Sequence, residues 1–259
     1  MNAPSTDILR VSNIHKSFDK TPLLRGVSFV VRSGERLVIL GPGGCGKSTL
    51  LKVILGIVPA DSGEVEVLGL KVAELDRTQR LGLLKQVGMA FQQGALFDFM
   101  TVRENILFAM ENMTELPRLE MEERVTQMLE AVYLPSAGRK MPSELSGGMR
   151  RRVGIVRAMV TDPKLALLDE PTAGLDPVTS TVVIDMIHKL GVRTQSALLC
   201  VTSSVEVAFT FATQVAILKD GVIAGQGSWD ELHALGDPWV NNFLDVREFK
   251  PPAKAPAQP

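Results

Sequence analysis

The sequence lacks a cysteine network, an excess of charge of one sign and the pattern of an export signal. Its two cysteines, Cys45 and Cys200, lie far apart among 259 residues, which excludes a disulfide framework and favours a reducing compartment. The 28 basic and 29 acidic side chains give a formal net charge of −1. A protein that binds nucleic acid by neutralising phosphates needs a basic excess, so we expect no nucleic-acid partner. The first ten residues, MNAPSTDILR, have no charged segment followed by an apolar one, and no export signal is expected.

A long uncharged apolar run is also missing. The mean hydropathy of +0.15 is high for a soluble protein, and the most apolar window covers residues 197–218. Polar and charged side chains interrupt this window, whereas a membrane span needs about 18 uncharged residues in succession. The window instead predicts a strand, a helix and a second strand, because buried parallel strands raise mean hydropathy without contact to lipid.

The sequence does contain a regular alternation of strand and helix patterns. A chain of this length accommodates one large domain, or one domain with a lobe. Short strand patterns occur at residues 8–11, 27–31, 37–40, 65–68, 87–91, 165–168, 198–202 and 215–218. Helical patterns separate most of them, which is typical of an α/β fold with a mainly parallel sheet covered on both faces.

Between residues 101 and 142 the strand pattern disappears. Apolar residues recur there at helical spacing, namely Met121, Val125, Met128, Leu129 and Val132. This spacing predicts a helical insertion with one apolar face. Packing in the core is the favoured interpretation of that face, and a docking surface for a partner is the alternative, because methionine adapts to irregular surfaces. The Pro- and Ala-rich segment from Lys250 to the end is predicted to be disordered.

Residues 41–48, GPGGCGKS, form a phosphate-binding pattern between a predicted strand and a predicted helix. Its four glycines are expected to let the backbone turn so that successive N–H groups point at phosphate oxygens, and the helix N-terminus adds its dipole. Lys47 can reach the β- and γ-phosphates, and the Ser48 hydroxyl can ligate Mg²⁺. A chance match in a chain of this length is on the order of one in a hundred. Cys45 is expected to matter for its small size, with a lowered thiol pKa at the helix N-terminus as the alternative.

The segment LALLDE, residues 165–170, is an apolar strand that ends in two carboxylates. The last residue of a buried strand lies at the carboxyl edge of the sheet, where α/β folds bind ligands. Asp169 can hold Mg²⁺ through water, and Glu170 can orient or deprotonate an attacking water. An isolated Asp-Glu pair also occurs in simple turns. Together with the phosphate-binding pattern, however, the pair indicates a site of nucleotide hydrolysis.

A second anion site is predicted about a hundred residues further along the chain. Residues 145–148, LSGG, precede a helical pattern at residues 150–160. Ser146 is a good N-cap, and the N–H groups of the two glycines lie at a helix N-terminus. One nucleotide cannot easily occupy two such sites on one globule. Arg150, Arg151 and Arg152 follow directly, and a solvated helix face is a better explanation for them than a nucleic-acid site.

The order of these motifs resembles the nucleotide-binding subunit of ABC transporters. The pattern consists of the phosphate-binding loop, Gln92 after a strand, LSGG, and DEPTAGLD at residues 169–176. The resemblance covers roughly residues 7–247 and implies a P-loop NTPase fold: an ABC-type nucleotide-binding domain with an N-terminal antiparallel β subdomain and a helical subdomain at about residues 94–160. It also implies a head-to-tail dimer of two copies, in which ATP lies between one copy's P-loop and the other copy's LSGG, and this arrangement accounts for the two anion sites.

The same resemblance implies roles for individual residues. Phe18 is expected to stack on adenine, Asp176 to communicate across the dimer, and Gln92 to sense the γ-phosphate and Mg²⁺ and to couple them to a membrane partner. The expected ATP-binding residues are Phe18, Gly41, Pro42, Gly43, Gly44, Cys45, Gly46, Lys47, Ser48, Thr49, Leu145, Ser146, Gly147, Gly148 and Asp176. The expected catalytic residues are Lys47, Gln92, Glu170 and Ser203, and the expected Mg²⁺ ligands are Ser48, Gln92 and Asp169.

Two longer strings are similar to the ATPase of Mla-type, Mce-associated phospholipid transport systems. They are FQQGALFDFMTVRENILF at residues 91–108 and KMPSELSGGMRRRVGIVRAM at residues 140–159, and DPWVNNFLD at residues 237–245 agrees with them. This resemblance implies an integral membrane permease, an Mce-domain lipid carrier and a small STAS-domain protein as partners. It places the chain peripherally on the cytoplasmic face of the inner membrane. The Pro-rich end gives no support for an ordered tail that clasps the second subunit.

The sequence departs from the family at one position. The family has a histidine in a V-T-H-D string, where it contacts the γ-phosphate, and this chain has Val201, Thr202, Ser203 and Ser204. A serine hydroxyl is shorter and cannot become cationic, so we expect ATP binding and dimerisation with slow or partner-dependent hydrolysis. The alternatives are a nucleotide-gated module that rarely hydrolyses ATP, an ABC ATPase for another substrate, and a non-transport ABC ATPase. The last is disfavoured because too few residues separate Gln92 from LSGG for a long coiled-coil insertion.

Overall fold

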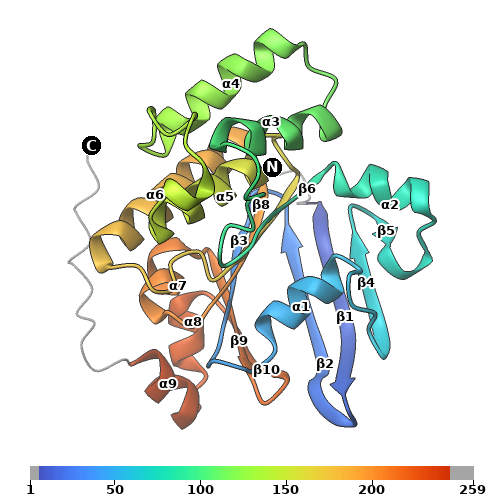
Figure 1. Ribbon diagram of the computed structural model, residues 1–259. Coiled ribbons are helices and arrows are strands. Elements are labelled where there is room, and N and C mark those ends of the chain that lie inside the picture. Colours follow the sequence, from blue (N-terminus) through green and yellow to red (C-terminus); the bar gives the residue numbers. More distant parts are fainter. Residues whose placement is uncertain (1–5, 246–259) are drawn as a thin grey trace, which may run out of the picture.

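The computed structural model describes residues 6–245 and contains two β-sheets with helices around them (Figure 1). The strands are β1 (Asp7–Phe18), β2 (Thr21–Arg32), β3 (Arg36–Leu40), β4 (Ser62–Val67), β5 (Leu70–Lys71), β6 (Val87–Ala90), β7 (Leu165–Asp169), β8 (Ala197–Thr202), β9 (Gln214–Lys219) and β10 (Val222–Gly227). The helices are α1 (Lys47–Ile54), α2 (Arg77–Leu84), α3 (Val102–Met113), α4 (Arg118–Ala131), α5 (Gly147–Met159), α6 (Pro177–Thr194), α7 (Val205–Phe211), α8 (Trp229–Ala234) and α9 (Pro238–Leu244). The predicted disordered tail and the predicted domain end at residue 247 lie outside the described residues.

The larger sheet has six strands in the order β10-β9-β3-β8-β7-β6. Its strands are parallel except for the pair of β9 and β10. Alternate residues of the parallel strands enter two different cores: Val38 and Leu40 pack on one face, and Leu37 and Ile39 on the other. A sheet buried on both faces explains the continuous apolar runs, and the prediction of an α/β fold with a mainly parallel sheet is confirmed.

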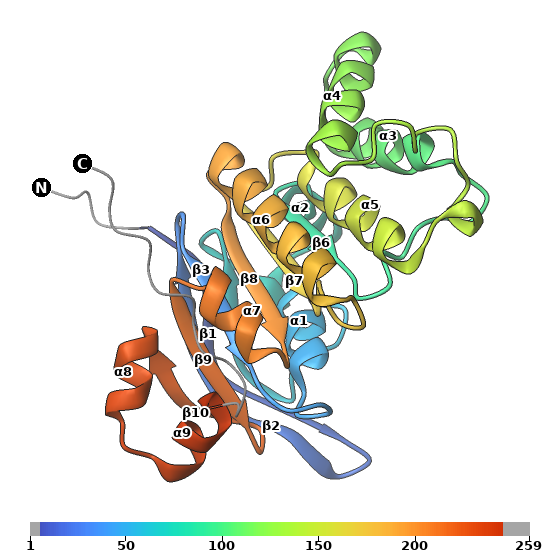
Figure 2. The ribbon, with the colours of Figure 1, turned by 90° about the vertical axis from the view of Figure 1, so that its left-hand side faces the viewer.

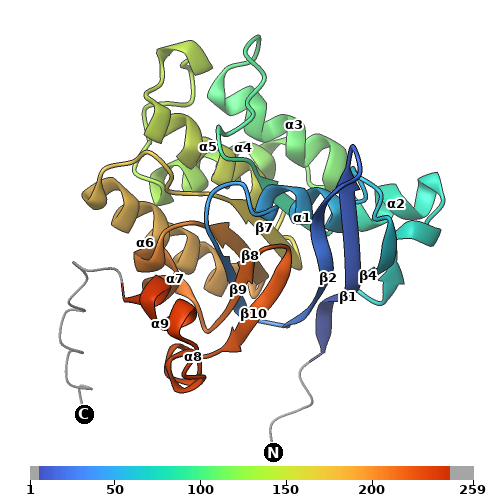
Figure 3. The same cartoon turned by 90° about the horizontal axis from the view of Figure 1, so that it is seen from below.

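The smaller sheet is antiparallel, with the order β2-β1-β4-β5, as the family resemblance implies. Side chains of this sheet and of α1 join one face of the parallel sheet in a single apolar cluster, so α1 lies in the layer between the two sheets (Figure 3). β1 and β2 are each 12 residues long, much longer than the predicted runs at residues 8–11 and 27–31. Their outer halves carry polar and exposed residues, which hide the strand pattern in the sequence.

The helices α3, α4 and α5 form a lobe at the far end of the molecule from α8 and α9 (Figure 2). Every member of the predicted apolar stripe, from Met121 to Val132, is at most 8% exposed and packs in the larger core cluster. The interpretation of this stripe as core is therefore confirmed, and its alternative as a docking surface is wrong. None of the helices described between residues 6 and 245 is both long and apolar enough to cross a membrane.

Candidate active site

The phosphate-binding loop connects β3 to α1, and its glycines serve different purposes. Gly44 and Gly46 adopt φ values of 78° and 104°, which L-residues with a side chain rarely adopt. A Cβ on Gly41 would lie 2.4 Å from the Leu218 carbonyl oxygen, whereas at Gly43 and Gly44 it would meet nothing within 4 Å. A left-handed turn therefore requires glycine at Gly44 and Gly46 but not at Gly41 or Gly43, and Gly41 instead allows close packing. The open space above Gly43 and Gly44 leaves the backbone accessible to a phosphate group.

Lys47 and Ser48 begin α1 and point toward the carboxyl end of β7. The Lys47 side chain is only 6% exposed, and its Nζ donates to the carbonyl oxygens of Gly41 (2.9 Å) and Pro42 (3.0 Å). Ser48 Oγ donates to Asp169 Oδ1 at 2.9 Å. Burial raises the pKa of the Asp169 carboxyl, while the Ser48 hydrogen bond acts in the opposite direction. The structure thus brings the predicted phosphate and metal ligands of the P-loop and β7 together.

The donor set is suited to Mg²⁺. Oxygen atoms are the ligands that Mg²⁺ prefers, and it is usually bound through one or two carboxylates, with water and substrate phosphates completing its shell. Asp169 is 8% exposed, so its charge has lost most of its hydration and a nearby divalent cation would stabilise it. Among residues 6–245 no three His, Cys, Asp or Glu side chains gather into a metal site.

Glu170 follows β7 and is held from two sides. Its Oε1 lies 3.4 Å from Lys47 Nζ. Its Oε2 accepts hydrogen bonds from Thr202 Oγ1 (3.1 Å) and from the backbone N–H of Ser203 (3.2 Å). The backbone of Glu170 has a φ of 46°, a strained conformation that occurs preferentially at functional sites. Thr202 is a residue of this site to which the sequence assigned no role, although it ends β8, the strand next to β7 in the sheet.

The Ser203 side chain is exposed, and its backbone N–H, rather than its hydroxyl, contacts Glu170. A cavity of about 250 Å³ opens beside these two residues. Nearly half of the residues that line it carry hydroxyl groups, including Thr172, Ser180 and Thr210. The predicted position of the missing histidine is therefore next to Glu170 and open to solvent.

Gln92 and LSGG lie on the helical side of the molecule. The backbone oxygen of Gln92 accepts a hydrogen bond from Arg151 Nε of α5 at 2.9 Å. Ser146 caps α5, with Oγ accepting from Met149 N–H at 3.2 Å, so the predicted N-cap is confirmed. Within residues 6–245 no hydrogen bond or ion pair joins LSGG to the P-loop, and the two anion sites of one chain remain separate.

The three consecutive arginines are not a solvated helix face. Each side chain is partly buried and donates to a backbone carbonyl oxygen: Arg150 to Leu145, Arg151 to Gln92 and Arg152 to Val132. The prediction of a solvated face is therefore wrong, because the guanidinium groups fasten the surrounding loops to α5.

Of three further predicted residues, Asp176 and Phe18 lie at the ends of elements, and Cys45 lies in the phosphate-binding loop. Asp176 caps α6, and its hydrogen bonds from Thr179 hold the pKa of the carboxyl below its usual value. Phe18 ends β1 and is 48% exposed, with Lys16 Nζ 5.3 Å from its ring centroid. Burial raises the pKa of the Cys45 thiol, which argues against the alternative of a reactive thiolate and leaves the small size of Cys45 as its expected contribution.

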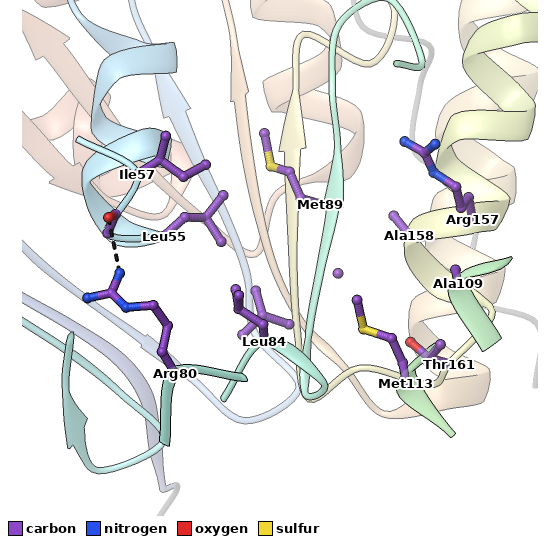
Figure 4. A pocket seen from close by; sticks show the side chains of 13 residues that line it. Leu55, Ile57, Arg80, Leu84, Met89, Ala109, Met113, Arg157, Ala158 and Thr161 are labelled. Carbon is purple, nitrogen blue, oxygen red and sulfur yellow. Dashed lines mark hydrogen bonds between the residues drawn. The ribbon is translucent and has the colours of Figure 1, made fainter. Parts of the chain in front are cut away.

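An apolar groove of about 420 Å³ separates α1 and α2 from the helical lobe. Leu55, Ile57 and Leu84 line one side, and Met113 and Arg157 line the other (Figure 4). Ile57 and Met113 are 59% and 37% exposed. Arg157 also donates to the carbonyl oxygen of Gly94 at 3.3 Å, two residues from Gln92, so the groove and the Gln92 loop share a side chain.

The fold and this site define a P-loop ATPase of the ATP-binding cassette class. Residues 24–173 match the family model described as ABC transporter, and the chain belongs to this family. It is accordingly an ATP-binding subunit with ATPase activity. Cassettes of this family dimerise and pair with membrane permeases.

Named relatives span most of the chain. The intermembrane phospholipid transport system ATP-binding protein MlaF of Escherichia coli strain K12 is 37% identical over 89% of this chain and 86% of its own length. The chloroplastic protein TRIGALACTOSYLDIACYLGLYCEROL 3 of Arabidopsis thaliana is 36% identical over 91% of this chain and 73% of its own length. Relatives at 31–34% identity are named for sulfate/thiosulfate import and, as probable, ribonucleotide transport.

A solved structure has the same fold. The dimeric post-hydrolysis state of the ATP-binding cassette MJ0796, bound to ADP and Pi, aligns with a TM-score of 0.78. It is 28% identical to this chain, and the alignment covers 85% of this chain and 98% of that one. The predicted ABC cassette fold, with its antiparallel β subdomain and helical part, is therefore confirmed.

Proposed function

We propose that this chain hydrolyses ATP to power a membrane permease that moves phospholipid. The observation that carries the proposal of hydrolysis is the cluster of Lys47, Ser48, Asp169 and Glu170 at the carboxyl edge of the parallel sheet. The phospholipid substrate is supported by the two sequence strings of the Mla type and by the 37% identity to MlaF. Relatives named for other substrates make the substrate the part of the proposal that most needs a test.

The roles of the site residues follow from their chemistry. The P-loop N–H groups and the Lys47 ammonium bind the β- and γ-phosphates and stabilise the charge that develops in the transition state. Ser48, Asp169 and Gln92 would hold Mg²⁺, which neutralises phosphate charge when bound. Glu170 orients the attacking water and accepts its proton. In place of the family's histidine, Ser203 offers a backbone N–H and an exposed hydroxyl.

A second copy of the chain completes each ATP site in this proposal. Ser146 and Gly147 of the LSGG segment are exposed at the N-terminus of α5, and the segment has no bond to its own P-loop within residues 6–245. A head-to-tail dimer would place it over the P-loop of the partner, so that both anion sites bind one nucleotide. Phe18 would stack on the adenine, and the exposed Asp176 would lie at the dimer interface.

The apolar groove in Figure 4 is the proposed contact for a short helix of the permease. Its exposed apolar side chains, such as Ile57 and Met113, would be covered by an amphipathic partner segment. Arg157 connects this groove to the Gln92 loop, so a partner bound there could shift Gln92. We further propose that the subunit lies peripherally at the cytoplasmic face of the membrane, with an Mce-domain carrier and a STAS-domain protein as partners.

The test of hydrolysis uses Glu170→Gln in the full-length chain. This variant should retain ATP binding and lose most of its turnover, because the amide cannot accept a proton from water. Sedimentation with ATP and Mg²⁺ should then show a stable dimer, whereas the native chain should dimerise only transiently. Unchanged turnover in Glu170→Gln would remove Glu170 from its proposed role.

A second candidate function is favoured by one observation, the absence of a histidine beside Glu170. The chain would then be a nucleotide-gated module that binds ATP and dimerises but hydrolyses rarely. Steady-state ATPase activity of the isolated subunit, measured again with its permease in lipid nanodiscs, separates the two. Turnover that stays negligible with the permease would support the gated module.

The phospholipid assignment has its own test. Affinity purification of the tagged chain from detergent-solubilised membranes of its own cells should recover a permease and an Mce-domain protein. The complex in proteoliposomes should transfer fluorescent phospholipid in an ATP-dependent manner, and a Lys47→Ala complex provides the control. Recovery of a permease with a periplasmic binding protein for a polar solute would contradict the lipid assignment and leave the ATPase assignment intact.

A further inference from the structure

Thr202 occupies a buried position where three parts of the active site meet. Thr202 is 0% exposed and is the last residue of β8. Its carbonyl oxygen accepts a hydrogen bond from the Gly41 N–H at 3.2 Å, which joins it to the start of the P-loop. Its hydroxyl is the part that contacts Glu170. Thr202 therefore touches both the phosphate-binding loop and the proposed water-activating carboxylate.

The hydrogen-bond pattern fixes the direction of the Thr202 hydroxyl. Thr202 Oγ1 accepts a hydrogen bond from the backbone N–H of Ser204 at 3.1 Å. Its own hydrogen is therefore directed elsewhere, and Glu170 Oε2 lies 3.1 Å away. An ionised carboxylate can only accept, so the hydroxyl donates to it. Thr202 itself is 0% exposed, and a hydrogen bond donated by a buried hydroxyl is stronger than one made at the surface.

We propose that Thr202 is a positioning residue for catalysis, whose hydroxyl holds the Glu170 carboxylate in the orientation that activates water. The proposal rests on the proposed role of Glu170 as the residue that activates water. In this chain, which lacks the family's histidine, the residue at the end of β8 would hold this carboxylate. The exposed Ser203 hydroxyl makes no such contact; only the Ser203 backbone N–H assists.

Two substitutions distinguish the contribution of the Thr202 hydroxyl from that of its methyl group. Thr202→Val replaces the hydroxyl by a methyl of similar size, and Thr202→Ser keeps the hydroxyl and removes the methyl. Hydrogen bonds to charged groups are the stronger ones, and their loss corresponds to a rate change of about tenfold or more. We expect Thr202→Val to lower the kcat of ATP hydrolysis by about tenfold or more, with little change in the KM for ATP or in ATP affinity. Thr202→Ser should turn over within about threefold of the native chain.

A matched control lies at the opposite end of the same strand. Ser196 precedes β8, is 3% exposed and donates through its hydroxyl to the Pro163 carbonyl oxygen. Ser196→Ala removes a buried hydroxyl without touching the site and should leave kcat unchanged. Thr202→Ala is a second way to remove the Thr202 hydroxyl, and it serves in case Thr202→Val does not fold, as judged by ATP binding.

The outcomes separate this proposal from the proposed function. Native kcat in folded Thr202→Val or Thr202→Ala overturns the positioning role, and so does a Thr202→Ser chain as slow as the valine variant, since packing would then be the cause. Glu170→Gln is measured in parallel. If it is inactive while the Thr202 variants are normal, only the inference on Thr202 fails. If Glu170→Gln retains native turnover, the proposed role of Glu170 fails first.

Discussion

At the scale of single residues, the active site is a set of polar groups whose hydrogen bonds leave little freedom. Lys47 is bound to two carbonyl oxygens of its own loop and lies close to Glu170. Glu170 adopts a left-handed backbone conformation, which costs of order 1–3 kcal/mol for a residue with a side chain. The hydrogen bonds at its carboxylate and the packing of β7 between β6 and β8 hold it there. A strained acidic residue beside a buried lysine is typical of a site shaped for chemistry rather than for stability.

The exposed position of Ser203 leads to a prediction for hydrolysis. Ser203→His restores a side chain that can donate from a ring nitrogen and carry positive charge. Contacts of this kind to developing charge commonly change rates on the order of 10² to 10³, so turnover should rise by at least about tenfold while ATP affinity changes little. Steady-state ATPase assays and ATP titrations measure the two quantities. Ser203→Gln, which is neutral and similar in size, is the control and should not reproduce the gain. No gain with histidine would mean that another residue already fills the role.

At the scale of elements, α5 connects the LSGG segment, the Gln92 loop and the groove. It begins at Gly147, directly after the LSGG serine that caps it, and its arginines donate to carbonyl oxygens of three different loops. Gly154 of α5 lies directly against Gly94, since an added Cβ would be 2.6 Å from the Gly94 Cα. Partner binding at the groove and nucleotide binding at LSGG would therefore act on one rigid helix.

The contact between the two glycines can be tested by overpacking. Gly154→Ala forces backbone against backbone, because Gly94 offers no flexible side chain that could move away. The free energy of unfolding should fall by about 1–3 kcal/mol, and turnover should fall as the Gln92 loop shifts away from Arg151. Urea denaturation and ATPase assays measure these effects. Gly82→Ala in α2, where an added Cβ meets nothing within 4 Å, should instead stabilise the chain by about 0.5–1 kcal/mol. Equal stability of both variants would contradict the close contact.

The elements also show what could be predicted from the sequence. The strands at residues 37–40 and 165–168 were identifiable because both faces are buried and every residue is apolar. The outer half of β1 was not identifiable, because it carries polar and partly exposed residues. The strand β10 was not identifiable either, because it has exposed residues and glycines and its place depends on pairing with β9. The P-loop, Asp169 and Glu170 follow from local motifs. Thr202 could not be assigned a role, since its importance comes from the neighbouring strand and not from its own surroundings in the chain.

At the scale of the whole molecule, the near-zero net charge and the exposed apolar groove agree with a subunit that works between other proteins. The P-loop and LSGG lie on separate parts of the chain with no bond between them in residues 6–245. A monomer would leave each half of the site facing water, where phosphate contacts are weaker. The proposed head-to-tail dimer removes this problem by symmetry, since each copy supplies one half to each site.

Mixing two inactive variants tests this arrangement. Lys47→Ala disables the P-loop, and Ser146→Arg blocks the LSGG segment, so each variant alone should be inactive. In a head-to-tail heterodimer one site combines both defects, and the other combines an intact P-loop with an intact LSGG. In an equal mixture about half of the dimers are mixed and each has one intact site, so roughly a quarter of the native ATPase activity should return. Mixing Lys47→Ala with Glu170→Gln is the control, because both changes affect the P-loop side and no intact site can form. If each chain hydrolyses ATP with its own two motifs, neither mixture will gain activity, and the head-to-tail site will have to be abandoned.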